Sequence, residues 1–465
     1  MGKAIQDYNF FYSFFKPLVA YSARCHYRHF VVRDASRLPM RGGYILAPCH
    51  QQALMEPLAV LNVTRRPTVF LARADIFAKP AARAGLTFLK ILPVYRIRDG
   101  KSSLSKNAAI FDQSRRVLLD GYPLCLMAEG RHNNRHQLLP LVKGMFRIAG
   151  EAQRQMGSRP LKIYPVGIDF DHYEAPYADV VVHVGEPIDV QQYAEVFESN
   201  EPVALNRMRS DVGAAMQHMM HDIRSTRHYD EIYTLSNILN RDVRKVKGLR
   251  NGAWSRFATR QTLSRLLDQM ETEEDAAFEP MMETTRRYQA LCREWRLDER
   301  LTAERWNVAA WLLSSLALLL VVGACVALPV VRQVVLFVVV CFPLPFVPTA
   351  FIPRRLIKDT QFRSSINYAI RFLSTVLYTL VMSVVVGVTH GLWLGRLWPG
   401  VGGFWWWLVA FDLPLLLAPT VGYGVRWVRD LFANWRYRLL RLTHSRVRQL
   451  DALRVELFDG VRDRL

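Results

Sequence analysis

A histidine and a glutamate lie six positions apart in the stretch APCHQQALMEPLAV, residues 47–60. His50 follows an apolar, strand-like run, and Glu56 falls at the start of a helix-like run. A histidine oriented by a carboxylate is a competent general base near neutral pH. Six positions within one helix would hold the two side chains apart, so they can meet only across a turn, which Pro48 allows. The alternative is an ordinary turn histidine.

Charged residues follow two other strand-like runs. Arg73 ends the run in FLARADIF, where its planar guanidinium could bind a phosphate or form a surface salt bridge. In LMAEGRHNNRHQLLPLVKG, Glu129 and Gly130 follow a strand-like run, and Arg131 and Lys143 come after them. Glycine lets a backbone approach a ligand closely, and the cations would attract an anionic ligand. These residues are candidates for binding a phosphate-bearing substrate.

A fourth stretch and a pair of histidines complete the candidates. The strand-like run IYPVGIDF contains Pro165, Val166 and Gly167, where a lipid or substrate chain could pass. His132 and His136 are four positions apart, but the sequence shows no evident third metal ligand. We therefore predict no metal and no cofactor. The six cysteines form no CxxC pair and no metal-ligand spacing, which is typical of a reducing compartment.

Taken in chain order, the stretches CHQQALME, FLARADIF, AEGRH…LVKG and YPVGIDF resemble the four blocks of the glycerolipid acyltransferases of the lysophosphatidate acyltransferase family. The resemblance covers about residues 30–190, and the whole layout is similar to a bacterial branch with a C-terminal membrane region. It implies transfer of a fatty acyl group from acyl-coenzyme A or acyl carrier protein to the hydroxyl of lysophosphatidate. It also implies that His50 is the base and Glu56 its orienting carboxylate. The substrate-binding residues that it implies are Arg73, Glu129, Gly130, Arg131 and Lys143 for the acceptor, and Pro165, Val166 and Gly167 for the acyl chain.

Three residues depart from the family pattern. Cys49 stands where the family has asparagine before the histidine. Glu56 comes after five intervening residues, where the family usually has aspartate after four. Arg131 follows the Glu-Gly pair in place of threonine or a small residue. The departures leave other readings open: glycerol 3-phosphate or a lyso-aminolipid as the acceptor, or a catalytically silent membrane scaffold.

Alternating strand-like and helix-like runs over residues 30–190 predict an α/β fold, with a mixed sheet flanked by helices. The predicted strands are GGYILAPC, TVFLAR, YPLCLMAEG, LKIYPVGID and ADVVVHVGEPI. A membrane-proximal aromatic segment at 1–30 is expected to precede the acyltransferase domain at 31–200. A helical extension at 201–305, a transmembrane region at 306–428 and a basic amphipathic C-terminal helix at 429–465 are expected to follow.

Long stretches without charge dominate the C-terminal third of the chain. Residues 307–331, 333–353 and 372–395 contain no charged side chain, and 397–425 contains only Asp412. About twenty apolar residues suffice for a helix to cross a bilayer, so we predict about four transmembrane helices.

Charge placement predicts the orientation and the partner. Basic residues gather between the second and third charge-free stretches and in the C-terminal tail. The positive-inside rule therefore places the catalytic domain and the tail on the cytoplasmic side of a bacterial inner membrane. The net charge of +20 also favours an anionic partner, and no nucleic-acid motif accompanies it, so the predicted partner is the lipid bilayer. A transporter has weak support, because His390 and Asp412 are the main polar residues of the spans.

Overall fold

The computed structural model describes residues 4–95, 106–131, 133, 135–173, 178–300, 307–328, 362–389, 424 and 426–465. The chain forms two compact units. The first comprises Met1–Arg24, His29–Tyr173 and Ala178–Asp222. The second comprises Cys25–Arg28, Glu174–Tyr177 and Ile223–Leu465.

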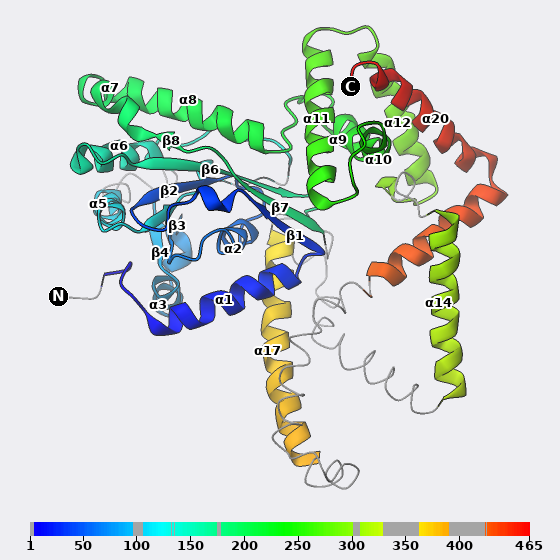
Figure 1. Ribbon diagram of the computed structural model, residues 1–465, viewed down its shortest axis with the longest axis horizontal. Coiled ribbons are helices and arrows are strands. Elements are labelled where there is room, and N and C mark those ends of the chain that lie inside the picture. Colours follow the sequence, from blue (N-terminus) through cyan, green and yellow to red (C-terminus); the bar gives the residue numbers. More distant parts are fainter. Residues whose placement is uncertain are drawn as a thin grey trace. The chain divides into compact units, whose positions relative to one another are not determined.

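A mixed sheet forms the centre of the first unit (Figure 1). Its strands are β1 (His29–Arg33), β2 (Tyr44–Pro48), β3 (Val69–Arg73), β4 (Ile91–Val94), β5 (Pro123–Cys125), β6 (Lys162–Phe170), β7 (Asp179–Val184) and β8 (Ile188–Asp189). They lie in the order β1-β7-β6-β2-β5-β3-β4, with β8 beside β6. β2 runs parallel to β5 and β6, whereas β6 and β7 are antiparallel. The predicted mixed sheet is confirmed.

All five predicted strands are present, and the sheet has three further strands: β1 and β4 at its edges, and β8 beside β6. β1 and β4 were not predicted, because both are short and Pro93 within β4 argues against a strand. Edge strands tolerate proline because one side of the strand makes no ladder hydrogen bonds. The five predicted strands are the ones that carry or support the candidate site.

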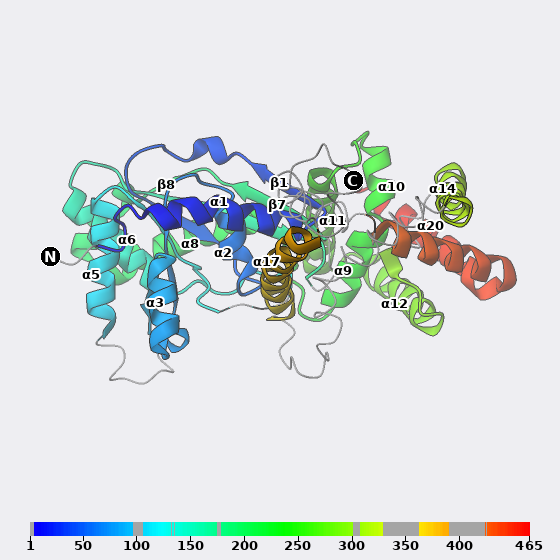
Figure 2. The same cartoon turned by 90° about the horizontal axis from the view of Figure 1, so that it is seen from below.

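Helices cover both faces of this sheet. They are α1 (Phe10–Cys25), α2 (Met55–Val60), α3 (Pro80–Phe88), α5 (Lys106–Leu119), α6 (Gly144–Met156), α7 (Ala194–Ser199) and α8 (Glu201–Met219), with short 3₁₀ turns at Ala35–Arg37, Ala74–Phe77 and Val190–Tyr193. α6 and α8 lie on one face, and α1 and α2 lie on the other (Figures 1 and 2). α8, expected to begin the helical extension, packs against β6 and belongs to this unit.

α1 is anchored to the α/β unit and also exposes an aromatic surface. Lys16 Nζ donates hydrogen bonds to the carbonyl oxygens of Thr64 and Arg66, at 2.8 and 2.7 Å. Tyr12 is buried against the same unit. Four aromatic side chains of the helix are exposed: Phe10, Phe11, Phe14 and Phe15. The helix therefore packs on its own domain through one side and presents phenylalanines on the other.

The second unit is helical, as predicted for the extension. Its helices are α9 (Tyr229–Ile238), α10 (Asn240–Val246), α11 (Ala253–Thr272), α12 (Phe278–Glu294), α14 (Val308–Ala327), α17 (Arg363–Thr389) and α20 (Ser445–Arg462). α9, α11, α12 and α20 share one hydrophobic core, to which Leu235, Leu263, Met282 and Leu450 contribute. Helical residues 426–443 precede α20.

The C-terminal region differs from the single basic helix predicted at 429–465. The chain leaves the helical conformation at His444, where φ is −128° and ψ is 118°, so two helices form. Val447, Leu450, Leu457 and Val461 are buried in the core of the second unit. The apolar face of α20 therefore packs on protein, and its basic residues remain on the outside.

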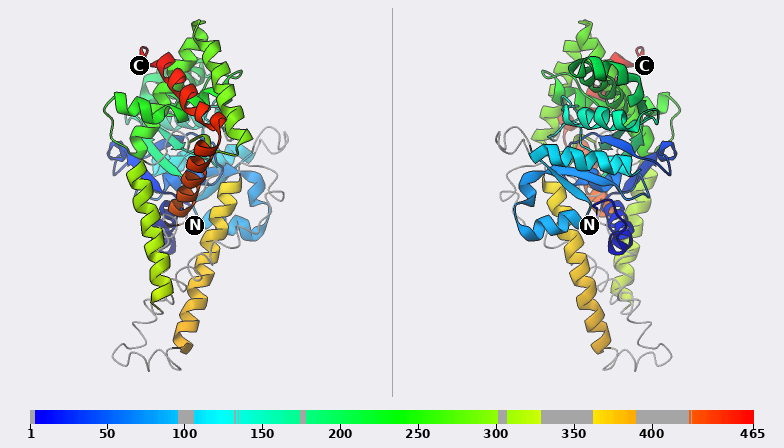
Figure 3. Two further views of the ribbon diagram at one scale, coloured as in Figure 1. Left: turned by 90° about the vertical axis from the view of Figure 1, so that its right-hand side faces the viewer. Right: turned by 90° about the vertical axis from the view of Figure 1, so that its left-hand side faces the viewer.

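α14, the long yellow-green helix of Figure 3, carries apolar side chains that are exposed to solvent. They include Leu312, Leu313, Leu316, Leu319 and Leu320. Among the described residues, no helix has both the length and the hydropathy required to cross a membrane. The predicted span at 333–353 and, apart from Gly424, the one at 397–425 lie outside the described residues.

Candidate active site

The chain turns sharply between β2 and α2, and this turn brings His50 and Glu56 together. Ala53 lies in the turn with φ of 39°, a left-handed conformation that is uncommon for residues other than glycine. Glu56 is in the first turn of α2. Its Oε2 lies 3.4 Å from His50 Nδ1, so the two form an ion pair when the imidazole is protonated. The two residues meet across a turn, as the sequence required.

Backbone hydrogen bonds fix the carboxylate of Glu56. Oε1 accepts hydrogen bonds from the backbone N–H of Gln51, at 2.8 Å, and of Gln52. Glu56 is fully buried, and charge-assisted bonds of this kind stabilise a carboxylate that is removed from water. A fixed carboxylate beside Nδ1 favours the tautomer with the imidazole proton on that nitrogen. In that tautomer Nε2 is the unprotonated nitrogen, which is able to act as a base.

Glu129 positions the backbone of the same histidine through a hydrogen bond. Its Oε1 accepts a hydrogen bond from the backbone N–H of His50 at 2.6 Å, and its Oε2 accepts one from Leu139 at 2.8 Å. Burial raises the pKa of Glu129 to about 8, although the two backbone hydrogen bonds act in the opposite direction. Sequence reasoning placed Glu129 among the acceptor-binding residues and missed this positioning role, because the contact joins residues 79 positions apart.

Gly130 is required by the turn that follows Glu129. Its φ is 63°, a conformation that glycine adopts at little cost. A Cβ atom at this position would lie 2.9 Å from Cγ1 of Val142. Both the backbone conformation and the close approach therefore favour glycine here.

The strand β6 holds the end of β2 in place. Pro165 and Val166 lie opposite Ala47 and Pro48 in the parallel ladder. A Cβ on Gly167 would lie 2.3 Å from the carbonyl oxygen of Met219, so α8 can approach this strand only because residue 167 is glycine. Pro165, Val166 and Gly167 are buried within the sheet.

Cys49 adds a side-chain link between the same strands. Its Sγ accepts a hydrogen bond from the backbone N–H of Ile168 at 3.1 Å and donates to the Ile168 carbonyl at 3.3 Å. Burial raises the pKa of the thiol, which keeps it protonated. The cysteine that replaces the family's asparagine thus fastens the residue before His50 to β6.

The candidate phosphate-binding cations come from three other segments of the unit. Arg73 ends β3, and its Nε lies 2.9 Å from Oδ1 of Asp75. Arg131 and Lys143 are exposed, and Lys143 directly precedes α6. The carboxyl ends of the parallel strands β2, β3 and β5 meet at one edge of the sheet, where ligands of α/β proteins commonly bind. Arg73 is the last residue of β3, and His50 comes two residues after the end of β2, so both lie at this edge.

Comparison with known proteins identifies the domain. Residues 29–169 match the family model described as Acyltransferase. The chain carries an acyltransferase domain. The matched segment contains the first three motifs and all but Phe170 of the fourth, and the predicted acyltransferase domain is confirmed.

One solved structure is similar to part of this chain. The crystal structure of the 1-acyl-sn-glycerophosphate (LPA) acyltransferase PlsC from Thermotoga maritima is similar, with 17% sequence identity and a TM-score of 0.33. The similarity covers 44% of this chain and 78% of that one. A search of curated proteins finds no significant match.

Proposed function

We propose that this protein transfers a fatty acyl group from acyl-coenzyme A or acyl carrier protein to the hydroxyl of lysophosphatidate, a step of phospholipid synthesis. The observation that supports this most is the buried His50–Glu56 pair inside an acyltransferase domain. A catalytically silent scaffold would have no need of a carboxylate that two backbone N–H groups fix beside a histidine. An acyltransferase needs this arrangement to remove a proton from its acceptor.

The reaction proceeds by direct attack. Nε2 of His50 takes the proton of the acceptor hydroxyl while the hydroxyl oxygen bonds to the thioester carbonyl carbon. The tetrahedral intermediate then expels the thiolate, which receives the proton from the imidazolium. The products are an oxygen ester and a free thiol, and His50 returns to its neutral form. Glu56 stabilises the imidazolium between the two proton transfers, and base catalysis of this kind contributes about a hundred- to ten-thousand-fold in rate.

We assign binding of the acceptor phosphate to three cationic side chains. Arg73, Arg131 and Lys143 are the candidates, and the side chains of Arg131 and Lys143 are exposed to solvent. Arg73 would exchange part of its ion pair with Asp75 for the phosphate, which its planar guanidinium can bind through two hydrogen bonds. Pro165, Val166 and Gly167 support the strand beneath His50, close to where the acyl chain is expected.

Membrane association is part of the proposal, because both the acceptor and the product are lipids. The exposed phenylalanines of α1 suit the interface of a bilayer, and the charge-free stretches of the C-terminal third suit its interior. The net charge of +20 favours anionic headgroups. We place the protein in a bacterial inner membrane, with the catalytic domain and the tail on the cytoplasmic side.

Acyl transfer by the purified full-length protein tests this proposal. Lysophosphatidate and glycerol 3-phosphate are offered in parallel in detergent, each with a long-chain acyl-coenzyme A or acyl carrier protein thioester. We expect phosphatidate from the wild type, none from His50→Ala, and normal yield from His183→Gln, a histidine variant in β7. Product only with glycerol 3-phosphate would reassign the acceptor. No product with either acceptor and either donor would overturn the proposal.

A further inference from the structure

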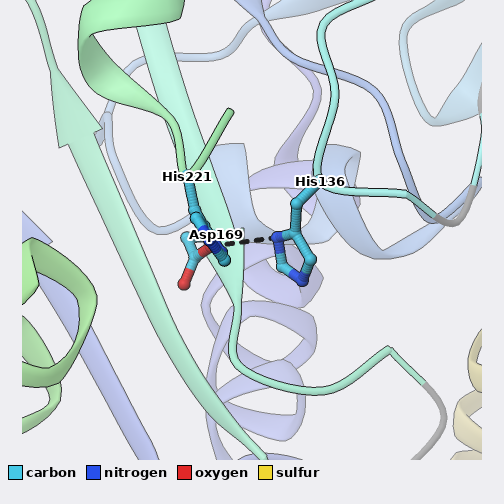
Figure 4. A group of neighbouring side chains, drawn as sticks. All are labelled: His136, Asp169 and His221. Carbon is cyan, nitrogen blue, oxygen red and sulfur yellow. Dashed lines mark ion pairs between the residues drawn. The ribbon is translucent and has the colours of Figure 1, made fainter. Parts of the chain in front are cut away.

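Three ionisable side chains from separate parts of the chain meet inside the first unit (Figure 4). His136 comes from the loop between β5 and α6, Asp169 from the end of β6, and His221 from the segment after α8. Their exposed fractions are 2%, 3% and 1%. One potential ligand atom from each lies within 4.8 Å of the other two. The sequence predicted no metal here, because it offered His132 and His136 without a third ligand.

Burial makes this grouping costly unless the charges are compensated. A buried carboxylate must be paired, hydrogen-bonded or bound to a metal, since transfer of an isolated charge from water is very unfavourable. Oδ1 of Asp169 lies 3.4 Å from Nδ1 of His136. Two ligands bound to one tetrahedral Zn²⁺ at about 2.0–2.1 Å lie about 3.3–3.4 Å apart. The spacing of these two atoms therefore matches a shared zinc ion.

We propose that His136, Asp169 and His221 bind one divalent transition-metal ion, with Zn²⁺ as the best-fitting species. Two imidazoles and one carboxylate are a donor set that suits zinc and related metals, whereas Mg²⁺ and Ca²⁺ prefer an all-oxygen shell. The imidazole rings of His136 and His221 are already adjacent, with centroids 4.6 Å apart. The three ligand atoms lie within 4.8 Å of one another, and sharing one zinc ion would bring them to about 3.3–3.4 Å.

Tyr173 completes the surroundings of the proposed site. Its ring stacks on His136 with centroids 4.6 Å apart, and its hydroxyl lies 3.2 Å from Nδ1 of that histidine. A metal on Nδ1 replaces this hydrogen bond. The freed hydroxyl is then placed to bond a water molecule in the fourth coordination position, which is open in three-ligand zinc sites.

The site lies next to the hydrogen bonds that hold the catalytic histidine. Leu138 N–H donates to Oδ1 of Asp222 at 2.8 Å, and Leu139 N–H donates to Glu129, which accepts from the backbone of His50. A metal ion would therefore join the loop that begins after Glu129 to β6 and to the end of α8. Its role is structural, because it would stabilise the residues whose hydrogen bonds position the His50 backbone.

Metal stoichiometry of the full-length wild type is the first test. A chelator first removes metal from the detergent-solubilised protein, which is then equilibrated with ZnCl₂ and desalted. Bound zinc is measured by inductively coupled plasma mass spectrometry. We expect one zinc per chain, and one Co²⁺ with a tetrahedral absorption spectrum when cobalt replaces zinc. A wild type that retains no zinc above the level of a metal-free control protein overturns the proposal without recourse to variants.

Ligand variants locate the ion. His136→Gln, Asp169→Asn and His221→Gln should each lower zinc affinity at least about tenfold, since removal of one of three ligands costs more than removal of an outer-shell partner. His183→Gln is the control, because His183 is outside the proposed ligand set and its Nε2 lies 2.9 Å from Oδ2 of Asp34. Zinc retained at wild-type affinity by all three ligand variants would contradict the assignment. Metal content is measured without substrate, so this result is separable from the acyltransferase proposal.

Discussion

Replacing Glu56 with glutamine tests the catalytic pair with little change to the fold. The amide oxygen can occupy the place of Oε1 and still accept the backbone hydrogen bonds of Gln51 and Gln52. The amide nitrogen then occupies the place of Oε2, 3.4 Å from Nδ1 of His50. Since this nitrogen is a donor, Nδ1 must become the acceptor and the proton moves to Nε2. The histidine can no longer take a proton from the acceptor hydroxyl.

The size of the effect follows from the role assigned to the base. General base catalysis contributes about a hundred- to ten-thousand-fold, which is about 2.7–5.4 kcal/mol of activation free energy. Stability should change far less, by about 1 kcal/mol, because the backbone hydrogen bonds to residue 56 are kept and only their charge assistance is lost. Glu56→Gln should therefore lower kcat strongly and shift the unfolding temperature slightly.

The assay is the rate of thiol release from acyl-coenzyme A in the presence of acceptor, recorded beside thermal unfolding. Glu186→Gln serves as the control, because Glu186 is an exposed carboxylate paired with Arg37. A folded Glu56→Gln protein whose kcat equals that of the wild type would refute the assignment of Glu56. If kcat falls only in proportion to a loss of folded protein, Glu56 has a structural role alone.

Two further predictions concern the support of the site. The pKa of Glu129 is raised to about 8 from its ordinary value of 4.5, so its contribution to stability is fully present below pH 4.5 and is lost as the pH rises to about 8. Denaturant titrations across this range should show the decline in the wild type and its absence in Glu129→Gln, and equal pH dependence in both would contradict the assignment. Gly167→Ala should destabilise the protein by more than about 2 kcal/mol, because the new Cβ would lie 2.3 Å from the carbonyl oxygen of Met219. Gly85→Ala, in the open surroundings of α3, is the control, and equal unfolding temperatures for the two variants would show that β6 and α8 can separate without cost.

The sequence by itself determined the main layout of the α/β unit. Apolar runs predicted β2, β3, β5, β6 and β7, because strands buried on both faces need continuous apolar side chains. The four motifs indicated an acyltransferase, and the family match over residues 29–169 agrees. The contact between His50 and Glu56 could also be predicted from the sequence, because only a short turn separates the two residues. These features depend on residues close together in the chain.

Tertiary structure alone decided the contacts between distant residues. The bond from the His50 backbone to Glu129 and the grouping of His136, Asp169 and His221 join segments up to 85 positions apart. Such contacts depend on the order and register of strands, which local periodicity does not encode. A sequence shows which side chains are able to bind a proton or a metal. Only the packing of β6 against β2 and α8 brings those side chains close to one another.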